Sequence, residues 1–166
     1  MGLDVCVYCD CVEKQKLIEP HPYPKQLFIG RNGSPEIRSV DAAKVERHDT
    51  WMQMPPCKHD EMTAASAHLG NTGHVKLLRD SLLAFDGLQK QCPTLLSRVL
   101  QSGTHTGDFL TNHQVISLAS ELKALKKIDL GAVGLTSPQV VFLHSLISDL
   151  NLISKAALKL QKPIAF

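Results

Sequence analysis

The distribution of proline most constrains how this chain of 166 residues can fold. Six of the nine prolines lie in the first 60 residues: Pro20, Pro22, Pro24, Pro35, Pro55 and Pro56. Proline lacks a backbone N–H and its ring clashes with the preceding helical turn, so this region is expected to contain strands and loops and no long helix. From about residue 60 onward, apolar side chains recur at helical spacing. The sequence predicts one domain, 1–166, with a strand- and loop-rich half (1–60) and a helical half (61–166).

The first half carries two strand signals. Gly2–Val12 alternates in polarity, with apolar residues at 3, 5 and 7 on one face, because residues two apart on a strand point the same way. Leu27–Ile29 is a short apolar run followed by Asn32-Gly33, a pair typical of type I′ hairpin turns, and Ile37 lies on the returning strand. A small antiparallel sheet is expected from these segments.

Helical periodicity predicts four helices in the second half. They are a segment from Val75 to Phe85 that ends before Gly87, a segment around Leu95–Leu100, a segment opened by the capping box Thr111…Gln114, and a segment that begins at Ser137-Pro138 and ends before Pro163. The fold class predicted is therefore α+β, with a small N-terminal antiparallel sheet packed against about four C-terminal helices.

Composition narrows the function classes. A formal net charge of +2 with scattered basic residues gives no concentrated basic face, so we expect no nucleic-acid partner. No apolar run approaches the roughly 20 residues that cross a bilayer, and the first residues do not resemble a secretory signal. We therefore expect a cytoplasmic protein without membrane contact, in which the five cysteines stay reduced.

Two short pairs of metal-ligand residues are the sharpest chemical signal. Cys9 and Cys11 lie two residues apart at the end of the first predicted strand, and Cys57 and His59 repeat that spacing. Each pair can present two ligands to one point, and a closed tetrahedral zinc site takes four thiolates or imidazoles. The sequence thus predicts Cys9, Cys11, Cys57 and His59 as ligands of a structural zinc ion. Two alternatives remain: a smaller Cys/His site with different partners, or no metal, with the thiols as small buried apolar side chains.

A second candidate site is the polar loop 102–108, which contains glycines, hydroxyls, His105 and Asp108. His105 and Asp108 could serve as acid and base in a small hydrolase or transferase, with a metal or the Cys57 thiol as the activating group. The alternative is that this loop has only a structural role and connects two helices, with its own hydroxyls as caps. Near the second pair, His48 is expected to face solvent and Trp51 to anchor the core of the proline-rich region.

Three segments carry a resemblance to a known group of proteins: Met1-Gly2-Leu3-Asp4, Cys9-Asp10-Cys11 and 102–108. Together they are similar to small uncharacterised bacterial and phage proteins, some of which are immunity proteins of toxin systems. The resemblance implies a cytosolic bacterial protein and identifies no catalytic residue. The leading prediction is a non-enzymatic interaction protein, of immunity or regulatory type, that binds another protein such as a toxin and carries a structural zinc site.

Overall fold

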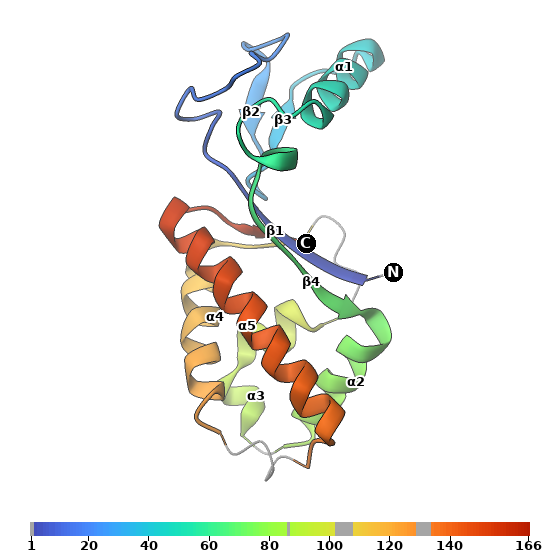
Figure 1. Cartoon of the computed structure of the whole chain (residues 1–166), viewed down its shortest axis with the longest axis vertical. Helices are drawn as coiled ribbons and strands as arrows, with labels where there is room; N and C mark the ends of the chain where they lie inside the picture. Colours follow the sequence, from blue (N-terminus) through green and yellow to red (C-terminus); the bar gives the residue numbers. More distant parts are fainter. Residues whose placement is uncertain (1, 86, 102–107, 129–133) are drawn as a thin grey trace.

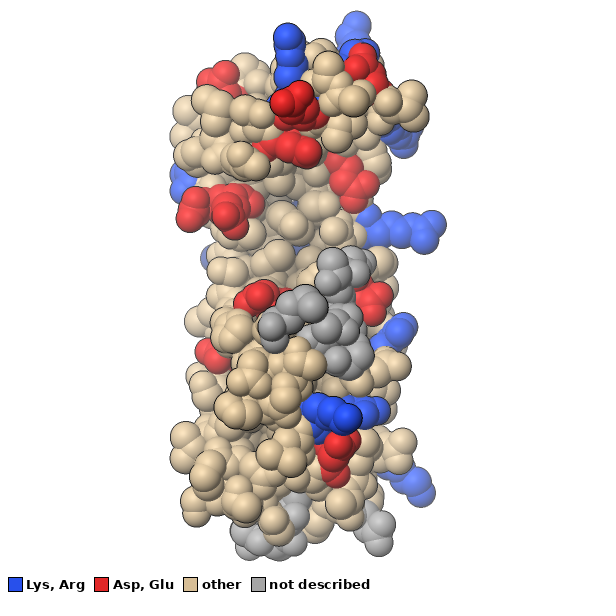
Figure 2. Space-filling model, turned by 90° about the vertical axis from the view of Figure 1, so that its right-hand side faces the viewer, with Lys and Arg blue, Asp and Glu red and all other residues tan. Residues whose placement is uncertain are grey.

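The computed structural model describes residues 2–85, 87–101, 108–128 and 134–166. The molecule is elongated, with a four-stranded antiparallel sheet near its middle, the helical core at one end and a smaller N-terminal lobe, residues 9–62, at the other (Figure 1). Cationic and acidic side chains are interspersed over the long face seen in Figure 2. The α+β class predicted from the sequence is confirmed.

The central sheet has the strand order β4-β1-β6-β5. Its strands are β1 (Gly2–Tyr8), β4 (Thr63–Asn71), β5 (Phe109–Leu110) and β6 (Ile164–Ala165), and every paired neighbour is antiparallel. The alternation predicted for the first strand is present, because the apolar residues at 3, 5 and 7 are all buried. They face the helices, so β1 supplies one apolar face to the core and leaves its other face uncovered by helices.

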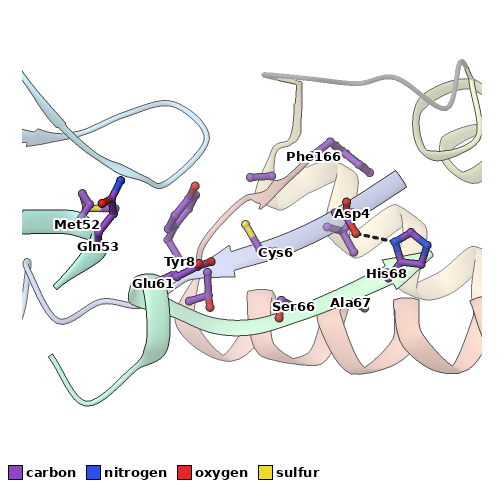
Figure 3. Close-up of a pocket in the computed structure, with 13 residues that line it drawn as sticks. Asp4, Cys6, Tyr8, Met52, Gln53, Glu61, Ser66, Ala67, His68 and Phe166 are labelled. Atoms are coloured by element: carbon purple, nitrogen blue, oxygen red, sulfur yellow. Dashed lines mark hydrogen bonds and ion pairs between the residues drawn. The ribbon is translucent and has the colours of Figure 1, made fainter. Parts of the chain in front are cut away.

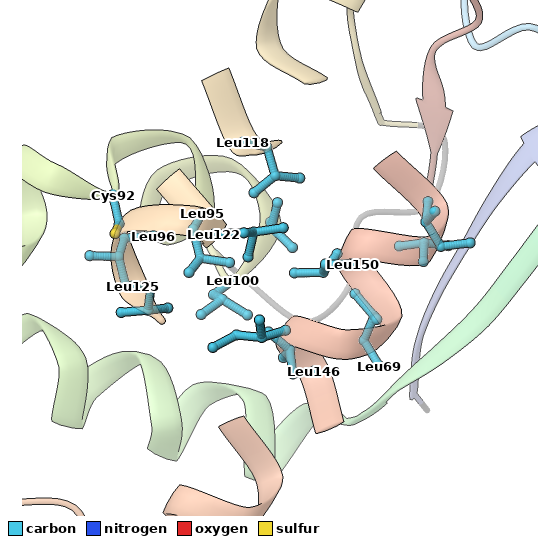
Figure 4. Close-up of a cluster of buried hydrophobic side chains, with 14 of the residues drawn as sticks. Leu69, Cys92, Leu95, Leu96, Leu100, Leu118, Leu122, Leu125, Leu146 and Leu150 are labelled. Carbon is cyan, nitrogen blue, oxygen red and sulfur yellow. The ribbon is translucent and has the colours of Figure 1, made fainter. Parts of the chain in front are cut away.

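The helical core consists of α2 (Thr72–Leu83), α3 (Leu88–Gln91), the short π-helical segment η2 (Leu95–Val99), α4 (Asn112–Leu125) and α5 (Ser137–Leu160). Leucines dominate the interior where α4, α5 and the sheet meet, as Figure 4 shows for Leu118, Leu122 and Leu150. The predicted capping box is present at α4: Gln114 N–H reaches the Thr111 hydroxyl at 3.4 Å, and Gln114 Oε1 accepts from Thr111 N–H at 2.8 Å.

A buried carboxylate stabilises the start of η2. Glu121 of α4 accepts hydrogen bonds from the backbone amides of Thr94 and Leu95, at 2.9 and 2.8 Å, and its side chain is almost completely buried. Amides at the start of a helical segment have no partner within it, so the carboxylate satisfies two groups that burial would otherwise leave unpaired. Glu121 thereby ties α4 to the segment that follows Cys92.

The N-terminal lobe contains the predicted hairpin, formed by β2 (Leu27–Ile29) and β3 (Pro35–Ile37). The turn differs from the predicted type I′. Gly33 has a φ of 88°, whereas Asn32 is not among the residues with positive φ, and type I′ requires both. The N–H of Gly33 donates to the Gly30 carbonyl at 3.0 Å, as in a type I turn followed by a left-handed glycine.

Two predictions about secondary structure were wrong. The helix α1 (Ala42–Gln53) lies inside the proline-rich half, because residues 36–54 contain no proline and Asp41 caps the helix through the amide of Ala43 at 3.0 Å. The nine-residue strand β4 lies after residue 60, where helices were expected. Its pairing with β1 determines its conformation, and that partner is some 60 residues away in the chain.

The longest helix, α5, is more apolar over its length than was expected of any segment from the sequence. Among the helices of the described residues, α5 is the one long and apolar enough, by length and composition, to cross a membrane. In this fold one of its faces is part of the core, with Leu146, Leu150 and Ile153 buried.

Candidate metal centre

The pairing of β1 with β4 brings the two ligand pairs together. In an antiparallel pair, residues just after one strand lie opposite residues just before the other. Cys9 and Cys11 follow β1, whereas Cys57 and His59 precede the short 3₁₀ turn η1 (Asp60–Met62) that leads into β4. The amide of Cys9 donates to the Met62 carbonyl at 2.7 Å and extends the contact one residue beyond the sheet.

The local geometry of the first pair differs from the prediction. The regular strand ends at Tyr8, and Cys11 lies in a turn in which the amide of Lys14 donates to the Asp10 carbonyl at 2.9 Å. Cys9 thus lies just beyond the end of the strand and Cys11 in the turn that follows, rather than both on one face of a strand. A local contact also holds the second pair together, because the amide of His59 donates to Cys57 Sγ at 3.4 Å.

The four predicted ligand atoms surround one point and form what we call the Cys/His cluster: Cys9, Cys11, Cys57 and His59. All four atoms lie within 4.8 Å of one another. The Sγ atoms of Cys9 and Cys57 are 3.7 Å apart, and His59 Nδ1 lies 3.4 Å from Cys11 Sγ and 3.6 Å from Cys57 Sγ. The cluster can bind a metal ion.

The three individual separations match the edges of a zinc tetrahedron. With Zn–S near 2.3 Å and Zn–N near 2.0–2.1 Å, the edges are about 3.8 Å between two sulfurs and about 3.5 Å between sulfur and nitrogen. A disulfide would need a sulfur separation of about 2.05 Å, and all five cysteines are free. The set of three thiols and one imidazole therefore suits a soft or borderline metal held in a closed site.

The cluster lies in the small core of the N-terminal lobe. Cys9, Cys11 and Cys57 are 3% exposed or less, and they pack with Trp51 and Met62. Trp51 anchors this region as predicted, and its Nε1 donates to the Glu19 carbonyl at 3.0 Å. Met62 is buried and packs with these cysteines, and nothing in the local sequence pattern distinguishes it from the exposed Met54.

Burial controls the charge of the thiols. It raises the pKa of Cys9 to about 12 and also raises the pKa of Cys11. Without a cation, both groups are neutral thiols at physiological pH, because a thiolate in this buried position would lose its hydration. A divalent cation would reverse this balance, because only the thiolate is a good ligand, and metal binding would release protons.

The prediction that His48 faces solvent was wrong. His48 is buried on α1 beside His21 and Trp51. The amide of Tyr23 donates to His21 Nδ1 at 2.9 Å, so the proton of a neutral His21 resides on Nε2, which donates to His48 Nδ1 at 3.1 Å. Burial lowers the pKa of His21 and favours this neutral form.

Of the alternative site, the described residue Asp108 lies apart from the Cys/His cluster. His105 and most of its loop, 102–107, lie outside the described residues. Asp108 is described and lines a separate cavity of about 200 Å³ with Arg98 and Gln114, which none of the four ligands shares. Cys57 Sγ does lie near His59 Nδ1, but both atoms belong to the Cys/His cluster.

Comparisons with protein-family models, with curated proteins and with solved structures found no match to this chain. The case for a metal centre therefore lies in the ligand geometry itself.

Proposed function

We propose that this chain is a non-enzymatic interaction protein whose N-terminal lobe folds around a structural zinc ion. One observation carries the proposal: four soft ligands from two segments 48 residues apart lie within 4.8 Å of one another, and three of their separations match the edges of a tetrahedral zinc site. Buried polar groups normally find partners within the protein, and a metal is the partner that satisfies three thiols and an imidazole at once.

The ligand set favours a structural ion over a catalytic one. Catalytic zinc keeps one coordination position for water or substrate, whereas four protein ligands close the tetrahedron. Three of the four ligands are also buried, and His59 alone is partly exposed. The metal would then contribute folding free energy to the lobe and leave binding to the surface around it.

A protein partner follows from the resemblance to proteins that include toxin immunity proteins. In that role the chain would occlude its partner with a preformed surface, and the zinc ion would keep that surface rigid. Three thiols that must stay reduced to bind zinc fit the expected cytoplasmic location. The immunity role, zinc as the metal and the location are parts of this one proposal.

Metal analysis of protein purified without added metal tests the proposal. About one equivalent of zinc per chain is expected, and Cys11→Ser should lose it. Cys6→Ser is the matched control: Cys6 lies on β1 outside the cluster, so this variant should retain the metal. Substitution with cobalt(II) should give the absorption of a tetrahedral thiolate complex. Unmodified protein free of metal, and unable to take up zinc under reducing conditions, would contradict the proposal.

A further inference from the structure

The uncovered face of the central sheet forms the floor of a cavity of about 760 Å³. Asp4, Cys6 and Tyr8 of β1 point to this side, opposite the long helix α5, as Figure 3 shows. One wall comes from Met52 and Gln53 at the end of α1, and the others from Glu61 of η1, His68 of β4 and the C-terminal Phe166. The volume lies in the range of ligand-binding pockets.

The chemistry of this cavity is that of a site for a positively charged group. Its thirteen lining residues, all described, include two carboxylates, Asp4 and Glu61, and neither lysine nor arginine. Among the described residues no side chain pairs with the Glu61 carboxylate, whereas Asp4 is held by His68 at 2.7 Å. Glu61 is thus available to bind a cation.

Aromatic rings and apolar side chains of the cavity also suit a positively charged side chain. Tyr8 and Phe166 lie on opposite sides of the Cys6 thiol in Figure 3, and ring faces attract ammonium and guanidinium groups. Met52 and Phe166 offer apolar surface to the hydrocarbon stem of lysine or arginine.

The backbone at Glu61 directs it to the cavity. Glu61 and Met62 both have positive φ, 45° and 56°, a conformation that costs non-glycine residues free energy. The result is that Met62 enters the core beside the Cys/His cluster while Glu61 lines the cavity on the other side of the same segment. Tyr8 likewise directly precedes the ligand Cys9, so the ligand segments and the cavity wall are continuous.

We propose that this cavity binds an extended basic segment of a partner protein, with an arginine or lysine side chain between Tyr8 and Glu61. This deepens the proposed function, on which it rests, by naming the chemistry of the partner. A peptide suits the site because the cavity is larger than one side chain and lies open along the sheet. Residues at every second position of an extended segment point to one side and can all face the floor.

Fluorescence anisotropy with a labelled nonapeptide, in which arginine alternates with glycine and serine, tests the inference. Saturable binding is expected, and the same peptide with glutamate in place of arginine should not bind. Glu61→Gln should weaken binding about fivefold, the scale of one partly exposed ion pair. Glu46→Gln is the matched control, because Glu46 is exposed on α1 and does not line the cavity.

Three results would overturn the inference: no saturable binding of the arginine peptide, equal weakening by Glu61→Gln and Glu46→Gln, or competition by free argininamide as strong as by the peptide. The last result would mean a small cation rather than a protein segment. Amide chemical shifts that change around Tyr8 and Glu61 on peptide addition give a second readout that needs no variant. Zinc content of the same samples separates the two proposals: zinc without peptide binding removes only the basic partner, and peptide binding without zinc removes only the metal.

Discussion

If the Cys/His cluster holds the proposed zinc ion, its removal should unfold the N-terminal lobe and leave the helical core folded. The two regions differ greatly in how much apolar surface they bury. Among the residues that the structure describes, the main core contains 25 buried residues, whereas the core of the lobe contains five, three of which are the cysteines of the Cys/His cluster. Regions with so little buried surface usually need a metal or a disulfide to stay folded.

The expected size of the effect follows from the ligand set. A structural zinc site contributes about 10–16 kcal/mol of apparent binding free energy, and a typical domain is stable by only about 5–15 kcal/mol. Trp51 and Met62 alone, at about 1.5–3 kcal/mol each, cannot replace that contribution. The free energy lost with the ion should therefore exceed the free energy of unfolding of the lobe. None of the four candidate ligands lies on a helix of the main core, so that core should persist.

The chain contains its own probe for this experiment. Trp51 is the single tryptophan and lies in the core of the lobe, so its emission reports on the lobe alone. Helical circular dichroism reports mainly on the other end, because α1 contributes 12 residues whereas α5 alone contributes 24. A chelator under reducing conditions should shift Trp51 emission to the red with a small loss of helical signal, and one equivalent of zinc should restore it.

This reasoning is wrong if Trp51 emission stays unchanged after the metal has been removed, since the lobe would then be stable without it. It is also wrong if emission and helical signal disappear in one transition, because the lobe and the core would then form a single cooperative unit.

Three further predictions concern the fold. Stability should fall as pH drops below about 6.5, because the pKa of His21 is lowered in the folded state and the unfolded chain binds the proton more readily; His21→Asn, which keeps an acceptor for the amide two residues on, should show a weaker pH dependence of melting temperature. Glu121→Ala should lower the free energy of unfolding by about 2–3 kcal/mol in urea denaturation, since the amides of residues 94–95 lose their acceptor in the interior; a change below 0.5 kcal/mol would contradict this role. Leu150→Ala should cost about 3 kcal/mol and Leu152→Ala little, because Leu150 is fully buried and Leu152 is 60% exposed on the same helix; equal losses would contradict the packing described.

Local signals predicted the parts of the fold that depend on neighbouring residues. The capping box at Thr111 begins α4 as expected, because both of its hydrogen bonds join residues three apart in the chain. The helix predicted from Ser137-Pro138 continues to Leu160 with its apolar stripe in the core. The hairpin between residues 27 and 37 formed as well, since its turn needs a glycine that can adopt positive φ.

The failures involve distant contacts. Residues 63–67 include three alanines, which favour helix, and they form β4 because β1 offers unpaired backbone groups beside them. The two residues of β6 join β1 to β5 and could not be recognised from a pattern so short. Helix α1 was missed for another reason: proline was counted over a whole region, although residues 36–54 have none.

The sequence by itself identified the four residues of the Cys/His cluster as candidate ligands, because thiols and imidazole are the side chains that soft and borderline metals prefer. Tertiary structure decided that they converge, through the antiparallel pairing of β1 and β4, and it placed Cys11 in a turn rather than on a strand. It alone created the cavity beside Glu61, because the walls come from four distant segments. Ligand chemistry is a property of individual side chains, whereas convergence and concavity depend on contacts between residues far apart in the chain.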